Sequence, residues 1–251
     1  MDGYDSATYG DRFAEVYDDW YGAITDTAAS VDTLAELADG RPVLELGVGT
    51  GRLAVPLAER GLQVTGVDTS RAMLDRLAAK GGQVTAVVGD MTDPPLGDER
   101  FGLVVIAYNT LFNLVDPADQ ARCLSNAAGR LHAQGILVIE AFVPQPEARP
   151  IDTVEPREVA ADKVVLSVSR SRPESQEVLG QYIDITEGGI ALRPWHIRWS
   201  TPAQIDQMAS EAGLDLSDRW ADWARTPFDD SSVSHISMYR ARESEQLFDR
   251  G

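Results

Sequence analysis

The stretch Val43-Leu44-Glu45-Leu46-Gly47-Val48-Gly49-Thr50-Gly51 decides the fold. An apolar run ends at an acidic residue, three glycines alternate with other residues, and a helical pattern follows from Arg52 to Glu59. A strand, a glycine-rich turn and a helix in this order build a nucleotide-binding corner. Glycines let the backbone approach a ligand where a Cβ would clash, and the free N–H groups of the helix N-terminus favour an anionic group.

The spacing of the glycines separates this stretch from the dinucleotide fingerprint. That fingerprint is Gly-x-Gly-x-x-Gly, with an acid about 20 residues further on. Here the third glycine, Gly51, comes one position early, and an acid, Glu45, precedes the first glycine. The triplet alone fits an ordinary tight turn equally well, so the rest of the chain has to decide.

Composition limits the class of protein. The 251 residues suit one large α/β domain, or a domain with a small appendage, and a hydrophobic fraction of 43% allows a sizeable core. A net charge of −18 disfavours nucleic acid and anionic membranes as partners, because such a surface repels phosphate groups. No apolar run reaches the roughly 18 residues of a membrane span, and the acidic start does not resemble a signal peptide. With Cys123 as the only cysteine, we expect a cytoplasmic protein without disulfides.

Short apolar segments alternate with helical patterns through most of the chain. We expect strands at 42–46, 63–67, 84–88, 102–107 and 136–140, and two more near 214–221 and 235–240. Strands this apolar, separated by helices, are typical of a parallel sheet that is buried on both faces. The fold class is therefore α/β, with a doubly wound, mostly parallel, seven-stranded Rossmann-like sheet.

Polar groups follow four consecutive strands of this sheet. They are the glycine loop, Asp68, Asp90 and Asn109. Sheets of this type bind ligands at the carboxyl ends of their strands, near the point where the strand order reverses. Four such groups in register indicate a binding site.

Together these segments resemble the class I S-adenosylmethionine-dependent methyltransferases. The resemblance covers about Tyr9 to Arg240, and its specific parts are Glu45–Gly51, Val67–Ser70 with Met73 and Leu74, Gly89–Met91 and Asn109–Leu114. It implies S-adenosylmethionine as the cofactor and methyl transfer to an O or N atom of a small-molecule acceptor, mainly by positioning and desolvation. The N-terminal aromatic segment and the late β insert resemble bacterial amino-sugar N-methyltransferases and related natural-product enzymes.

The resemblance also implies which residues bind the cofactor. Asp68 is expected to accept from the ribose hydroxyls, Asp90 from the adenine amino group, and Glu45 to face the ammonium through water. The full set is Tyr17 in the N-terminal arm, Glu45, Gly47 and Gly49 in the loop, Asp68, Thr69 and Met73 after the second strand, Asp90 and Met91 after the third, and Asn109 after the fourth.

An O or N nucleophile can require a general base, and the sequence offers three candidates. They are His196 in the insert, Glu140 at the end of the fifth strand, and Tyr108 after the fourth. His196 shares a strand face with Arg198, so structural packing is the favoured interpretation for it. No spacing of histidines and carboxylates indicates a metal site.

The remaining segments divide the chain into parts. We expect residues 1–40 to form a helical arm or lid, 41–145 and 200–242 the cofactor-binding core, 146–199 an antiparallel β insert, and 243–251 a polar tail. A single helix is expected over Tyr9–Tyr21, and three strands in the insert at 164–170, 179–186 and 190–199. The insert either covers the substrate site or forms a dimer surface. The sequence therefore leaves open whether the protein is a homodimer.

Two other functions stay open at this point. A nicotinamide-dependent oxidoreductase is disfavoured by the early third glycine and by the lack of several cationic groups near the loop for a pyrophosphate. A protein of the same fold could also bind the cofactor without transferring methyl, because methyl transfer needs no diagnostic catalytic residue. The sequence does not determine the acceptor, the choice between O and N, the use of a base or the oligomeric state.

Overall fold

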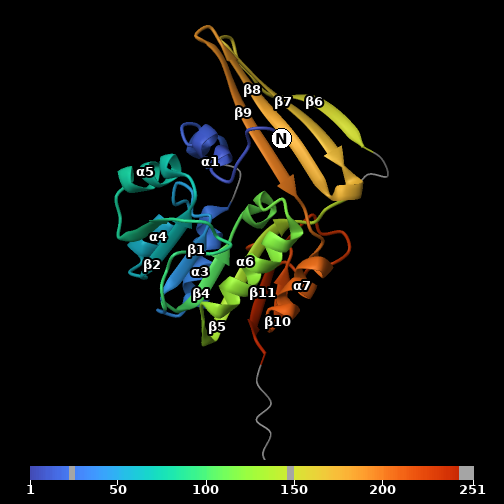
Figure 1. Cartoon of the computed structure of the whole chain (residues 1–251). Helices are drawn as coiled ribbons and strands as arrows, with labels where there is room; N and C mark the ends of the chain where they lie inside the picture. The colour runs from blue at the N-terminus through green and yellow to red at the C-terminus, as the bar shows by residue number, and fades with distance from the viewer. Residues whose placement is uncertain (23–25, 146–149, 243–251) are drawn as a thin grey trace, which may run out of the picture.

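The computed structural model describes residues 1–22, 26–145 and 150–242, which form a seven-stranded sheet and a four-stranded sheet (Figure 1). The larger sheet has the strand order β10-β11-β5-β4-β1-β2-β3. Its strands are β1 (Val43–Leu46), β2 (Val64–Asp68), β3 (Val84–Val88), β4 (Phe101–Ile106), β5 (Leu131–Phe142), β10 (Leu214–Trp220) and β11 (Ser234–Ala241). The expected tail at 243–251 lies outside the described residues.

The pairing of these strands confirms the expected α/β fold class. β1 to β5 run parallel to one another, whereas β11 runs antiparallel to both β5 and β10. The strand order reverses between β1 and β4, which is where doubly wound sheets bind ligands. β5 starts five residues before the expected strand, because the exposed polar segment 132–134 continues the strand with little apolar signal.

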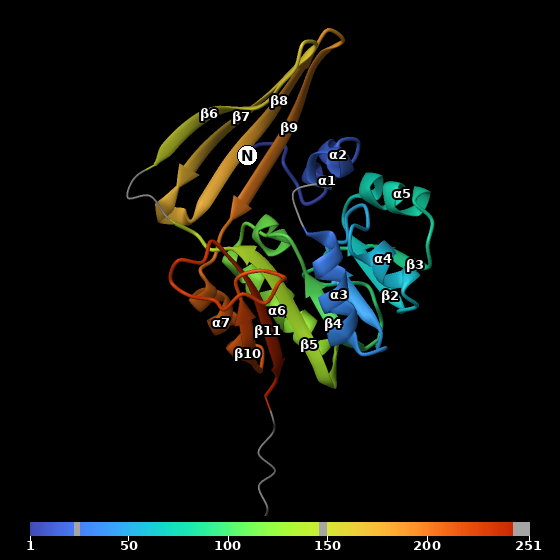
Figure 2. The same cartoon turned by 180° about the vertical axis from the view of Figure 1, so that it is seen from behind.

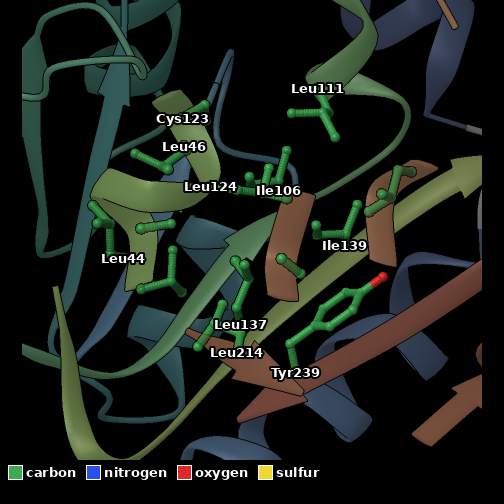
Figure 3. Close-up of a cluster of buried hydrophobic side chains, with 14 of the residues drawn as sticks. Leu44, Leu46, Ile106, Leu111, Cys123, Leu124, Leu137, Ile139, Leu214 and Tyr239 are labelled. Atoms are coloured by element: carbon green, nitrogen blue, oxygen red, sulfur yellow. The ribbon is translucent and has the colours of Figure 1, made fainter. Parts of the chain in front are cut away.

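Helices cover both faces of the larger sheet. α3 (Thr27–Ala38), α4 (Ala54–Glu59) and α5 (Arg71–Ala79) contribute to the core on one face, and α6 (Pro117–Gly129) and α7 (Pro202–Glu211) to the core on the other. Strand residues alternate between these cores, so Val43 belongs to the first and Leu44 to the second. Figure 3 shows Leu44, Leu46 and Leu124 in the second core. Burial on both faces fixes the carboxyl ends of the strands in space.

The N-terminal arm differs from the expected single helix. It forms α1 (Thr8–Phe13) and α2 (Tyr17–Tyr21), with a turn in which the Val16 N–H donates to the Phe13 carbonyl. The arm is anchored at two separate places: Arg193 donates to the Arg12 carbonyl at the end of α1, and Asp18 of α2 accepts from the Thr50 hydroxyl at 2.6 Å. To reach both anchors, the chain changes direction between α1 and α2. The helical periodicity of the sequence does not reveal this turn.

The insert is a four-stranded antiparallel meander that stands above the larger sheet (Figures 1 and 2). Its strands are β6 (Ile151–Val159), β7 (Lys163–Arg172), β8 (Glu177–Thr186) and β9 (Gly189–Arg198), so the expected count of three is wrong. The missed strand, β6, contains Pro156, at a register shift. Proline is tolerated there because β6 is an edge strand and its outer N–H groups need no ladder partner.

Candidate active site

A cavity of ≈ 300 Å³ lies at the carboxyl ends of the central strands, between the larger sheet, the arm and the insert. Most of the residues expected to bind the cofactor line it. These are Tyr17, Gly47, Gly49, Asp68, Thr69, Met73, Asp90, Met91 and Asn109. Glu45 lies behind the loop with 5% of its surface exposed, and it is not among the lining residues.

The glycine loop is held in left-handed conformations that suit glycine. Gly47 has φ 74° and Gly49 has φ 54°. A Cβ at Gly47 would overlap the methyl group of Thr110, whereas a Cβ at Gly49 would have no atom within 4 Å. The loop therefore leaves open space beside Gly49, in the part of the cavity where a ligand would meet the backbone.

The carboxylate of Asp68 ties this loop to the end of β2. Its Oδ2 accepts from the Gly49 N–H at 2.9 Å, and its Oδ1 accepts from the Ser70 N–H at 2.8 Å. Burial raises the pKa of Asp68, against the opposing effect of these two hydrogen bonds. Asp90 is more exposed, and its Oδ1 accepts from the Thr92 N–H at 2.8 Å.

Glu45 is a buried carboxyl with one oxygen, Oε2, that has no hydrogen-bond partner among the described residues. Burial raises its pKa to about 8, and the guanidinium of Arg52 is the strongest opposing influence. Arg52 also lies 3.9 Å from Glu140 Oε2 and 5.5 Å from the centre of the Tyr108 ring. Acidic and basic groups thus meet behind and beside the loop, as a ligand with an amino acid part requires.

Two cations near the loop were missed by sequence reasoning. Arg52 directly follows Gly51, so its place in the sequence could have indicated a cation beside the loop. Lys80 lies at the end of α5, and only the fold brings it close to the loop. Lys80 Nζ donates to Asp18 Oδ1 at 2.8 Å and to the Thr50 hydroxyl at 3.1 Å. Each cation lies beside a carboxylate, Arg52 beside Glu140 and Lys80 beside Asp18, and neither is among the residues that line the cavity.

The arm and the insert add aromatic walls to the cavity. Tyr9, Tyr17 and Tyr21 come from the arm, and Tyr182 and Trp195 from β8 and β9. The ring centroids of Tyr17 and Tyr21 lie 4.8 Å apart, and those of Tyr182 and Trp195 lie 6.2 Å apart. Burial raises the pKa of Tyr21 to about 12 and raises that of Tyr17 further. These phenols stay neutral at ordinary pH.

Of the three candidate bases, only Tyr108 lines the cavity. Burial raises the pKa of its phenol as well. The two oxygens of Glu140 accept from the Tyr108 N–H and from Trp223 Nε1, each at 2.8 Å, so this carboxylate supports the backbone of the site. Asn109 is also tied down, since its Oδ1 accepts from the Phe142 N–H at 2.7 Å.

His196 lies on the strand face that turns away from the cavity. Its neighbours Trp195 and Ile197 line the cavity, whereas His196 is 8% exposed and its Nε2 lies 3.7 Å from Glu177 Oε1. Burial lowers the pKa of this imidazole. Within the described part of the chain, no group of three or more His, Cys, Asp or Glu side chains is arranged to hold a metal ion.

Comparisons with known proteins identify the family. A family model for a methyltransferase domain matches residues 43–135. The structure of the CcbJ methyltransferase from Streptomyces caelestis superposes with a TM-score of 0.89 and 40% sequence identity, over 95% of this chain and 100% of that one. This chain belongs to the S-adenosylmethionine-dependent methyltransferases.

Other proteins similar to this methyltransferase are named for the group that they methylate. The cypemycin N-terminal methyltransferase of a Streptomyces species is 29% identical over 236 residues, which is 89% of this chain and 94% of that protein. The sugar N-methyltransferase KedS8 from Streptoalloteichus sp ATCC 53650 has the same fold, with a TM-score of 0.68 and 23% identity over 97% of this chain and 99% of its own. The nicotinamide-dependent alternative is thereby removed.

The chemistry of the site fits S-adenosylmethionine, the cofactor of this methyltransferase. The open space at Gly49 suits a close approach to the backbone, and the carboxylate of Asp68 suits a diol. The unpartnered Glu45 oxygen and the Arg52 guanidinium suit the charges of an amino acid group. In the described ranges, no helix is long and apolar enough to cross a membrane.

Proposed function

We propose that this methyltransferase transfers the methyl group to an amine nitrogen of a small natural-product metabolite. The observation that carries this proposal is the absence of a suitable base: among the described residues that line the cavity there is no histidine, lysine or cysteine. An alcohol needs a base to accept its proton as it attacks. An uncharged amine already offers a lone pair, and it loses a proton to water after the new C–N bond has formed.

Four of the other titratable groups in the lining are poor candidates for that base. Burial raises the pKa of Tyr21 and Tyr108, so these phenols hold their protons. Asp68 is engaged by two backbone N–H groups. The exposed carboxylate of Asp5 accepts from the Thr8 hydroxyl, and this bond lowers the pKa of Asp5 and makes it a weaker base.

The relatives support nitrogen as the acceptor atom. The cypemycin enzyme is named for methylation of an N-terminus, and KedS8 is a sugar N-methyltransferase. Both names give a nitrogen acceptor, one at an N-terminus and one on a sugar. We extend this acceptor class, an amine on a small metabolite, to the present chain.

In this proposal the cofactor supplies a methyl group that its sulfonium has already activated, and the chain positions it and excludes water. Asp68 accepts from the ribose hydroxyls and Asp90 from the adenine amino group. Arg52, which the sequence did not indicate, binds the carboxylate of the amino acid part, and Glu45 faces its ammonium. The backbones of Gly47, Gly49 and Met91 contact the cofactor, and the side chains of Thr69 and Met73 pack against it. Asn109 lies beside the sulfur, and Tyr17 covers the cofactor from the arm.

The arm and the insert form the acceptor side in this proposal. Aromatic faces such as those of Tyr182 and Trp195 attract the positive charge that develops on the nitrogen. They also keep water from the reacting atoms. Glu140 positions the backbone of Tyr108, and His196 stabilises the insert, so neither acts as the base.

Matched acceptors test the proposal. The enzyme is incubated with ¹³C-methyl-labelled cofactor and pairs of small sugars or amino acid amides that differ only by an amine or a hydroxyl, and NMR identifies the methylated atom. We expect methyl transfer only to the amine member of a pair. Its kcat/KM should rise with pH as the amine of the acceptor loses its proton. Methylation of the hydroxyl member would overturn the assignment.

A further inference from the structure

The 3₁₀-helix η1 (Thr110–Asn113) follows β4 at the edge of the cavity. Thr110 and Asn113 line the cavity, whereas the two residues between them are completely buried in the second core. Side chains three residues apart eclipse each other in a 3₁₀-helix, so Thr110 and Asn113 share one face. The methyl group of Thr110 fills the space beside Gly47 of the glycine loop. Asn113 therefore lies one turn beyond this loop.

The other end of η1 is fixed to the insert by Gln120, which is completely buried in α6. Its side-chain NH₂ group donates to the carbonyl oxygens of Leu114 and Arg198, at 2.9 Å and 2.7 Å. Leu114 directly follows Asn113, and Arg198 directly follows Ile197, which lines the cavity at the end of β9. Asn113 therefore lies where the cofactor side of the cavity meets the insert.

The side-chain amide of Asn113 is half-buried and has no hydrogen-bond partner among the described residues. The other amide in the lining, Asn109, is engaged, because its Oδ1 accepts from the Phe142 N–H at 2.7 Å. Tyr108 and Asn109 both have left-handed backbones, with φ of 47° and 65°. Such conformations are unfavourable for residues other than glycine, and they cluster at functional sites. This strained turn aims η1, and with it Asn113, at the cavity.

We propose that Asn113 binds the acceptor nitrogen: its amide oxygen accepts one N–H of the amine and directs the nitrogen lone pair toward the methyl group. This inference rests on the proposed function, since it concerns transfer to an amine. A neutral primary amine has two N–H donors and a lone pair, so one donor binds Asn113 while the lone pair reacts. An amide oxygen suits this task because it accepts hydrogen bonds and the amide carries no charge.

This hydrogen bond strengthens as the reaction proceeds. The nitrogen lone pair forms the new N–C bond while the S–C bond breaks, and the electrons of that bond stay on sulfur. Because the nitrogen gains positive charge, its N–H becomes a better donor to the amide oxygen of Asn113. The contact therefore favours the transition state over the ground state. The ammonium product then gives one proton to water, so Asn113 accepts none.

Steady-state kinetics of the full chain test the proposal, with the amine members of the matched acceptor pairs as probes. We expect Asn113→Leu to lower kcat by roughly 10- to 100-fold, because it removes one hydrogen bond to a group that becomes charged. Its affinity for S-adenosylmethionine should not change, because Asn113 contacts the acceptor. Gln207→Leu also replaces an amide by leucine, at an exposed position of α7, and should change neither quantity.

Two failures of this experiment can be told apart. A kcat for Asn113→Leu equal to that of wild type would overturn the inference and leave the proposed function intact. Methylation of only the hydroxyl members would overturn the proposed function, and this inference with it.

Asn113→Asp separates direct contact from a structural role. Its carboxylate still accepts the N–H, but its charge stabilises the protonated amine and so raises the pKa of the bound acceptor. We expect the pH profile of kcat to move up by about one unit. The titratable side chains that line the cavity, Asp5, Asp68, Asp90 and the tyrosines, are the same in both proteins, so residue 113 causes the move. An unchanged profile would assign Asn113 to packing alone.

NMR gives a second measurement if a variant does not fold or if wild type methylates none of the acceptors. The ¹⁵N-labelled side-chain amide of Asn113 is observed in wild type with bound S-adenosylhomocysteine while glycinamide is added. At about pH 9 the α-amino group of glycinamide is mainly neutral. We expect the Asn113 signal to shift with glycinamide but not with acetamide, which lacks the amine. No shift, or an equal shift with acetamide, would overturn the inference.

Discussion

The backbone N–H of Gly49 donates a 2.9 Å hydrogen bond to the carboxylate of Asp68, which links the glycine loop to the end of the neighbouring strand. The second oxygen of Asp68 accepts from the Ser70 N–H, where α5 begins. One carboxylate thus fixes two backbone segments that border the cavity. In the proposed function it also accepts from the ribose, so its removal should affect both the loop and the ligand.

We predict that Asp68→Asn weakens S-adenosylmethionine binding by roughly 10- to 100-fold, which corresponds to about 1.5–3 kcal/mol for hydrogen bonds to a charged group. The amide has only one acceptor oxygen for Gly49 and Ser70, and its NH₂ group would face one of these donors. Isothermal titration calorimetry measures the affinity. Asp75→Asn, at an exposed position of α5, is the control, and equal affinities for the two variants would contradict the role of Asp68.

Gly47→Ala should destabilise the fold and weaken cofactor binding. The new Cβ would overlap the methyl group of Thr110, and the residue would keep a positive φ of 74°, which costs about 1–3 kcal/mol for a non-glycine residue. Thermal unfolding measures the loss. Thr110→Ser removes the overlapping methyl group. The double variant should therefore recover the stability lost through the steric overlap, but not the stability lost through the positive φ. A double variant no more stable than Gly47→Ala would show that overlap with Thr110 is not a cause.

The seven-stranded sheet and the loop could be predicted from sequence because their signals are local. Each buried strand is a short apolar run, and each polar strand end, such as Asp68, directly follows its run. Parallel topology then brings these ends to one edge without further information. The fold and the candidate cofactor residues therefore follow from patterns that span a few residues each.

The arm and the insert depend on contacts between distant segments, so the sequence described them less well. Phe13 and Trp20 share a helical face by spacing, but anchors on Arg193 and Thr50 break the arm between them. Period-two alternation separates His196 from Trp195, yet it does not tell which of the two faces the cavity. Trp195 faces the cavity because the arm packs on its side of the strand.

The buried pair Arg193 and Asp184 should be sensitive to the loss of one partner. Their charged groups lie 3.7 Å apart with side-chain exposures of 9% and 10%. We predict that Arg193→Met lowers the free energy of unfolding by about 3–5 kcal/mol, because it leaves Asp184 as an uncompensated buried charge. Urea denaturation measures this change. The double variant Arg193→Met, Asp184→Leu should recover the part of the loss that comes from the uncompensated charge, but not the part due to the lost bond to the Arg12 carbonyl. A double variant less stable than Arg193→Met would contradict this explanation.

Glu45 should make stability fall as pH rises. Burial raises its pKa from 4.5 to about 8, so between these values the folded state holds a proton that the unfolded state has lost. Protonation therefore favours the folded state. The contribution of Glu45 to stability is full below about pH 4.5 and is lost as the pH rises through 8.

Glu45→Gln tests this dependence because the amide stays neutral at every pH. In the absence of the cofactor, urea denaturation measures the free energy of unfolding of both proteins. The difference, variant minus wild type, should become more positive as the pH rises from 5 to 9. Glu59→Gln, at an exposed position, should show no such trend. Binding of the cofactor ammonium near Glu45 would lower its pKa, so at pH 7 wild type should release a proton on binding and the variant should not. Calorimetry in buffers of different ionisation enthalpy detects that proton, and equal release from both proteins would remove Glu45 as its source.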